Sequence, residues 1–142
     1  MFKKIVLSLL FLVLIIGTAN AVDVSNLKTP ENFEDIGDGV FVLYDSLKNA
    51  DEILSIVEYH EHDWDDYTTN DTENKYTVYE QNHTYNYTDN SVNEIGSFEL
   101  IKINGTKYIV DFAKNGATND LEFTYGNLME FNKLNNITPI EK

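Results

Sequence analysis

The sequence predicts an α+β fold: a mostly antiparallel β-sheet of about five to six strands, with a short N-terminal helix and a C-terminal amphipathic helix packed on it. Runs of β-branched and aromatic residues, separated by turn sequences, occupy much of residues 40–114. Asn104-Gly105 stands between two such runs, which is typical of a two-residue hairpin. Apolar residues at helical spacing follow over 121–134. These three features favour a sheet with a helix laid across it.

The first 21 residues have the layout of a secretory signal peptide. Lys3 and Lys4 precede an apolar run over residues 5–16, and Ala19-Asn20-Ala21 supplies a small-x-small cleavage pattern. A membrane span needs about 20 apolar residues, and this run ends too early. We therefore expect cleavage after residue 21, a single domain over residues 22–142, an extracellular or cell-surface location, and no stable membrane span after cleavage.

The sequence of the N-terminal part of the domain predicts a helix followed by strands. Thr29-Pro30 reads as the N-cap and first residue of a short helix through Ile36, and residues 40–44 form a dense β-former run. Residues 45–60 fit either a helical stripe or a strand face. Their β-branched content and the turn-like sequence at residues 48–51 favour a hairpin.

Two further hairpins are predicted. Residues 76–80 and 84–88 flank a turn at residues 81–83, and strand alternation would direct Tyr85 and Tyr87 inward but Asn82, Thr84, Asn86 and Thr88 outward. The second hairpin turns at Asn104-Gly105, which would pair Leu100 with Ile109 and Ile101 with Tyr108.

The C-terminal helix is expected to begin at an N-cap on Thr118 or Asn119 and to end before Pro139. Its apolar stripe should lie across the sheet. We expect the clustered aromatic residues of the preceding segment to fill the core, although a platform for stacking carbohydrate rings is an alternative. These residues are Trp64, Tyr76, Tyr79, Tyr85 and Tyr87.

The chain is acidic and contains no cysteine. Its formal charge is −14, and removal of the two signal-peptide lysines takes this to −16. Such a field repels phosphates and anionic lipid headgroups, so we expect no nucleic-acid partner. Without cysteine, disulfides and thiol chemistry are excluded, and the domain must be held together by its core.

Five Asn-x-Thr sequons indicate N-glycosylation of the exported chain, against the alternative that Asn and Thr are simply common in it. A glycan requires its asparagine to lie at the surface, so each occupied sequon constrains the fold. The candidate acceptors are Asn70, Asn82, Asn86, Asn104 and Asn136.

Three segments resemble a group of small exported, Asn-rich proteins of host-associated methanogenic archaea. They are residues 27–40, residues 107–112 and residues 127–136, with the sequences LKTPENFEDIGDGV, KYIVDF and NLMEFNKLNN. The resemblance covers the whole chain and implies an archaeal envelope, where Asn-linked glycans occur. It carries no activity and no catalytic motif with it.

One segment, residues 60–66, has the composition of a metal site. On a strand, His60 and His62 would project to one face, and Asp63, Asp65 or Asp66 would complete a site for zinc or a similar ion. A solvated acidic loop is the favoured interpretation, and a loose carboxylate site for a weakly bound divalent cation is a third. We therefore expect no cofactor beyond such a cation.

The sequence contains no motif of nucleophilic, metal-hydrolytic or nucleotide-dependent catalysis, so we expect no enzymatic activity. The favoured function is an exported, non-catalytic cell-surface or extracellular binding module whose partner is an unknown envelope polymer or protein. The alternative is an extracytoplasmic protein that binds a divalent cation or a small ligand.

Overall fold

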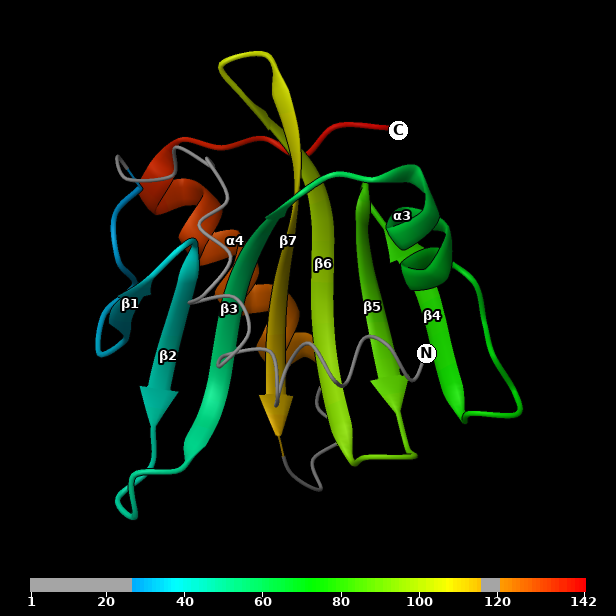
Figure 1. The fold of residues 1–142 in the computed structure, drawn as a ribbon, viewed down its shortest axis with the longest axis horizontal. Helices are drawn as coiled ribbons and strands as arrows, with labels where there is room; N and C mark the ends of the chain where they lie inside the picture. Colours follow the sequence, from blue (N-terminus) through cyan, green and yellow to red (C-terminus); the bar gives the residue numbers. More distant parts are fainter. Residues whose placement is uncertain (1–26, 116–120) are drawn as a thin grey trace.

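The computed structural model describes residues 27–115 and 121–142. Within them the fold is α+β, with a seven-stranded antiparallel sheet in the order β1-β2-β3-β7-β6-β5-β4 (Figure 1). The predicted signal peptide and the predicted N-cap at Thr118 or Asn119 lie outside the described residues. No helix in the described part is long and apolar enough to cross a membrane.

The elements follow one another with short connections, as expected for an antiparallel sheet. In chain order they are β1 (Glu34–Gly37), β2 (Val40–Tyr44), β3 (Ala50–Glu58), α3 (Glu61–Thr68), β4 (Tyr76–Gln81), β5 (Thr84–Asp89), β6 (Glu94–Ile103), β7 (Thr106–Asn115) and α4 (Leu121–Asn135).

The three predicted hairpins are confirmed. The β6–β7 register pairs Leu100 with Ile109 and Ile101 with Tyr108. Asn104 and Gly105 both have positive φ, as a type I′ turn requires. Strands β2 and β3 pair around a loop, and β4 and β5 pair around Asn82-His83, both again with positive φ. Each hairpin is specified by local signals, a short turn between two β-former runs.

The prediction of a short N-terminal helix is wrong. Pro30 begins a single turn, in which the Phe33 N–H donates to the Pro30 carbonyl at 3.1 Å, but Asn32 has a φ of 70°. That left-handed backbone cannot continue a right-handed helix. The chain then becomes β1, whose pairing with β2 outweighs the helical signals of Thr29-Pro30.

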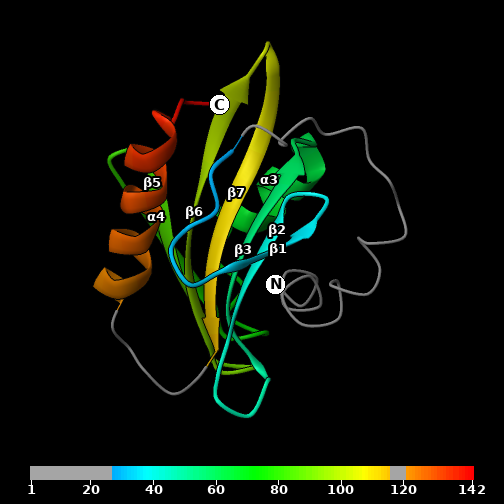
Figure 2. The same ribbon diagram turned by 90° about the vertical axis from the view of Figure 1, so that its left-hand side faces the viewer.

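Each face of the sheet carries its own core, and a helix packs on each (Figure 2). On one face α4 crosses the central strands, and Leu128 and Phe131 join Leu54, Val110 and other buried side chains. On the other face α3 contributes Trp64 and Tyr67 to an aromatic cluster with Phe98. Both faces of β6 and β7 are therefore buried over most of their length, so that polar residues such as Ser97, Glu99 and Asp111 are buried with the apolar ones.

Helix α4 ends before Pro139, as predicted, but a cap at Asn136 and not the proline terminates it. Asn136 has a φ of 58°, and the Ile137 N–H donates to the Asn132 carbonyl at 2.8 Å. This bond is the six-to-one bond of a Schellman cap. The tail then reaches the sheet, where the Ile140 N–H donates to the Leu100 carbonyl at 2.8 Å.

Candidate functional site

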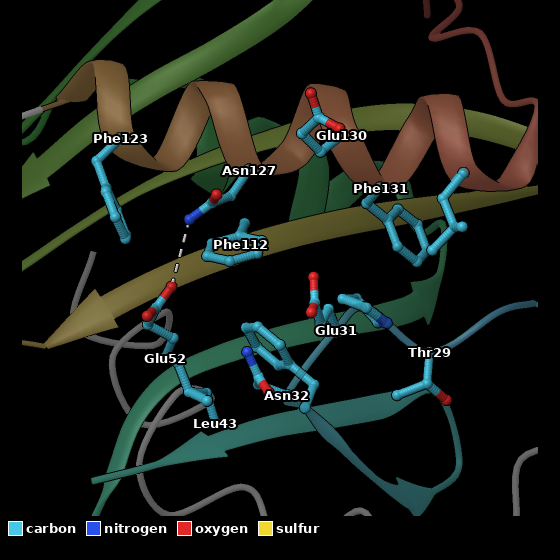
Figure 3. A pocket seen from close by; sticks show the side chains of 13 residues that line it. Thr29, Glu31, Asn32, Leu43, Glu52, Phe112, Phe123, Asn127, Glu130 and Phe131 are labelled. Carbon is cyan, nitrogen blue, oxygen red and sulfur yellow. Dashed lines mark hydrogen bonds between the residues drawn. The ribbon is translucent and has the colours of Figure 1, made fainter.

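A cavity of about 600 Å³ lies between α4, the turn at residues 29–33 and strands β2, β3 and β7 (Figure 3). We call it the α4 cleft. Four phenylalanine rings and three carboxylates line it, together with smaller polar and aliphatic side chains. The rings belong to Phe33, Phe112, Phe123 and Phe131, and the carboxylates to Glu31, Glu52 and Glu130.

The aromatic wall depends on the N-terminal turn that the sequence predicts as a helix. The turn brings Phe33 against Phe112 of β7, with ring centroids 5.7 Å apart in an edge-to-face arrangement. Phe131 of α4 packs against Phe41 of β2 at 6.3 Å. Because these contacts join segments far apart in the chain, the cleft is a tertiary feature and not a local motif.

Glu52 of β3 is the buried carboxylate of the cleft, with 5% of its surface exposed. Asn127 of α4 donates to its Oε1 at 3.4 Å, a long hydrogen bond (Figure 3). Burial raises the pKa of Glu52, the positive charge of Lys114 lowers it, and the negative charge of Asp51 raises it further. Glu31 and Glu130, by contrast, are exposed.

Lys114 of β7 lies beside the cleft. Its Nζ is 3.1 Å from Asp51 Oδ2 and 5.2 Å from the ring centroid of Phe123. Among the described residues that line the cavity itself, none carries a positive charge. The cleft therefore combines apolar aromatic walls with excess negative charge.

The segment that the sequence nominated for a metal lies on the opposite face of the sheet. Residues 61–68 form helix α3, so the predicted strand geometry for His60 and His62 is wrong: His60 is the N-cap residue and His62 lies in the first turn. His62 Nε2 is 3.6 Å from Asp66 Oδ2. Asp65 Oδ1 is 3.6 Å from Lys142 Nζ.

The described residues contain no group of three or more His, Cys, Asp or Glu side chains placed to hold a metal ion. Asp63 belongs to the same helix as Asp65. The amphipathic pattern of this helix explains the composition that suggested a site: Trp64 and Tyr67 are buried, and the exposed acidic residues Glu61 and Asp65 alternate with them. Because no such group of ligating side chains is present among the described residues, a metal site at His60, His62, Asp63 and Asp65 stays a prediction.

The aromatic residues that suggested a carbohydrate platform fill the core instead. Tyr76 and Tyr87 are fully buried, and Trp64 is 4% exposed. Tyr85 stacks on Phe98 with ring centroids 5.1 Å apart. Only Tyr79 among the nominated residues is largely exposed, at 52%.

The sequons divide by exposure. Asn70, Asn82, Asn104 and Asn136 are exposed. The prediction that Asn86 faces outward is wrong: it is 1% exposed, and its Nδ2 donates to Gln81 Oε1 at 2.9 Å. Helix α4 covers that face of β5. Since a glycan would be attached to that same nitrogen, Asn86 is a poor acceptor in the folded chain, while glycosylation of the other four stays a prediction.

Sequence reasoning missed the α4 cleft because its residues carry no local motif. One signal was available: by strand alternation, the acidic Glu52 shares a face of β3 with the apolar Leu54 and Ile56. Asn127 is a second polar residue, positioned one residue before the buried Leu128 of α4. Neither indicates a cleft until the two elements are brought together.

No protein-family model, curated protein or solved structure matches the chain. The resemblance to exported archaeal proteins therefore stays a prediction, and the geometry of the α4 cleft is the basis for a function.

Proposed function

We propose that the chain is an exported, non-catalytic binding module, at the cell surface or extracellular, that takes its ligand in the α4 cleft. The observation that carries this proposal is the cavity of about 600 Å³ with four aromatic rings in its wall. This volume falls within the range of known ligand pockets, about 300–1,000 Å³. Its partner would be an envelope polymer or protein that inserts one group into the cleft.

The distribution of exposed apolar side chains supports this assignment. Phe123 and Leu134 are 38% and 42% exposed, and both line the cleft from α4. A folded chain gains little by leaving large apolar side chains in water, but a binding surface uses them as contacts. The mouth of the cleft therefore offers apolar area to a partner.

A second candidate function is an extracytoplasmic protein that binds a small free ligand. The same cavity volume favours it, because a drug-sized molecule fits such a space without any protein partner. The two candidates differ in the mass of what occupies the cleft.

Site-specific photocrosslinking tests both. Benzoylphenylalanine is placed at Phe123 in the cleft or, as a matched control, at Tyr79, an exposed aromatic residue on edge strand β4. The exported chain is irradiated with its own culture supernatant and envelope fraction, and adducts are measured by mass spectrometry. We expect an adduct from position 123 only. The adduct should contain a macromolecule if the chain is a binding module for an envelope component, and a small molecule if the second candidate function holds.

Equal adducts from both positions, or none from position 123, would contradict the proposed function. Because the same benzoylphenylalanine side chain stands at both positions, non-specific trapping by an exposed aromatic group is separated from binding in the cleft.

A further inference from the structure

We infer that the group bound in the α4 cleft is an organic ammonium ion attached to an apolar body. This inference rests on the proposed function and names the chemistry of its ligand. It follows from three features of the described residues: a buried carboxylate with a single long hydrogen bond, two exposed carboxylates in the same lining, and aromatic rings between them.

The first step is the placement of the negative charges. Glu52 is 95% removed from solvent, and within the described part of the chain its side chain accepts one hydrogen bond, at 3.4 Å from Asn127. Lys114 acts on this carboxylate from beside the cleft, but its Nζ is paired with Asp51 Oδ2 at 3.1 Å. A buried carboxylate with one long hydrogen bond is costly unless a further cation or further donors approach it. An ammonium group brings both the charge and up to three N–H donors.

The second step is the position of the exposed carboxylates. Glu31 lies on the N-terminal turn and points toward α4, where Glu130 also lines the cleft (Figure 3). An anionic ligand would meet three like charges and no lining cation. A neutral ligand would gain nothing from them, whereas a cation is attracted by all three.

The third step is the role of the rings. The faces of aromatic rings attract cations, and such contacts strengthen where water is excluded. The chain already shows this combination beside the cleft, since Lys114 Nζ lies over the Phe123 ring and pairs with Asp51. In the cleft lining, the partly exposed ring of Phe33 and the carboxylate of Glu52 offer a ligand the same two kinds of contact.

Three probes that share a phenethyl group and differ in the group attached to it isolate the charge: phenethylammonium, 2-phenylethanol and 3-phenylpropanoate. They are titrated into the exported chain by calorimetry at low ionic strength, where charge effects are least screened. We expect phenethylammonium to bind about tenfold more tightly than 2-phenylethanol. This affinity ratio corresponds to the contribution of one charge-assisted hydrogen bond. The carboxylate probe should bind most weakly.

Matched variants separate the cleft from the general negative field of the chain. Glu31→Gln and Glu52→Gln each remove one lining carboxylate, while Glu73→Gln removes one exposed carboxylate that does not line the cleft. We expect the first two to lower the affinity ratio of ammonium to alcohol about three- to tenfold, and the control to leave it unchanged. Phe123→Ala should weaken both probes together.

Glu31 is exposed, so Glu31→Gln keeps the test usable if Glu52→Gln impairs folding. Equal binding of the ammonium and alcohol probes, equal effects of all three Gln variants, or no binding of any probe would each overturn the ligand class. If the Phe123 crosslink persists in that case, the proposed function stands with a different ligand. If the crosslink is also lost, the function fails as well.

Discussion

Tyr87 and Gly96 show how closely the side chains of the sheet are fitted. They are register partners on β5 and β6, and a Cβ added at Gly96 would overlap the ring and hydroxyl of Tyr87. Tyr87 cannot move aside, because its hydroxyl lies 3.2 Å from both Glu94 Oε2 and Asp111 Oδ1 in the core. The glycine is needed here for space.

Gly96→Ala is therefore expected to lower the free energy of unfolding by about 3 kcal/mol, the upper range for overpacking. Gly126→Ala is the matched control in α4, where an added Cβ meets nothing within 4 Å. That substitution should raise the free energy of unfolding by about 1 kcal/mol, since alanine favours a helix interior. Chemical denaturation measures both, and equal effects would contradict this packing.

At this scale the sequence predicts pairing but not burial. The alternation of β5 places Tyr87 and Asn86 on opposite faces, as expected from strand geometry. Which face meets solvent depends on the helices, and here both faces of β5 are covered, so Asn86 is as buried as Tyr87. A one-sided sheet was the wrong assumption for this strand.

Between elements, a carboxyl group is buried where α4 meets β6. Asn132 Nδ2 donates to Glu99 Oε1 at 2.8 Å, while Glu99 Oε2 and Asn132 Oδ1 have no hydrogen-bond partner within the described residues. Burial raises the pKa of Glu99 to about 7, although the Asn132 hydrogen bond lowers it. A protonated Glu99 carries the O–H donor that the Asn132 oxygen lacks.

This pair makes the attachment of α4 depend on pH. The Glu99 pKa is 4.5 in the unfolded chain and about 7 in the folded one, so the folded chain holds the proton more tightly. The resulting stability is complete below about pH 4.5 and is lost as the pH rises through 7. The shift corresponds to roughly 3 kcal/mol.

Glu99→Gln tests this directly, because glutamine has the donor and acceptor of the protonated acid at every pH. We expect the variant to match the parent near pH 4.5 and to exceed its free energy of unfolding by roughly 3 kcal/mol at pH 8. The difference between variant and parent, measured by denaturation across that range, cancels the titration of other groups. A difference independent of pH would exclude Glu99 as the cause.

Elements specified by short-range signals were the ones the sequence predicted. The Asn104-Gly105 turn fixes the β6–β7 register, and the spacing of Leu128 and Phe131 identifies α4. Two elements were missed. Strand β1 pairs with β2, which follows after only two residues, and this local pairing outweighs the helical signals of Thr29-Pro30. Helix α3 depends on a distant partner, because Trp64 and Tyr67 pack into the aromatic core of the other face.

For the whole molecule, the α4 cleft is the feature furthest from sequence prediction. Its wall combines a turn near residue 30, β2, β3, β7 and a helix near the end of the chain, so the lining residues are spread from Thr29 to Leu134. No short motif encodes such a place. Its chemistry follows only when Glu31, Glu52 and the phenylalanine rings are seen around one cavity.

The most direct test of the central claim is to locate the bound ligand by NMR. The isotope-labelled chain is titrated with phenethylammonium, and amide chemical-shift changes are followed residue by residue. We predict that the changes concentrate at residues 29–33, Glu52, Phe112 and the Phe123–Asn127 turn of α4. Changes centred on the acidic surface of α3, around Glu61 and Asp65, or spread evenly over the acidic chain would contradict the α4 cleft as the binding site.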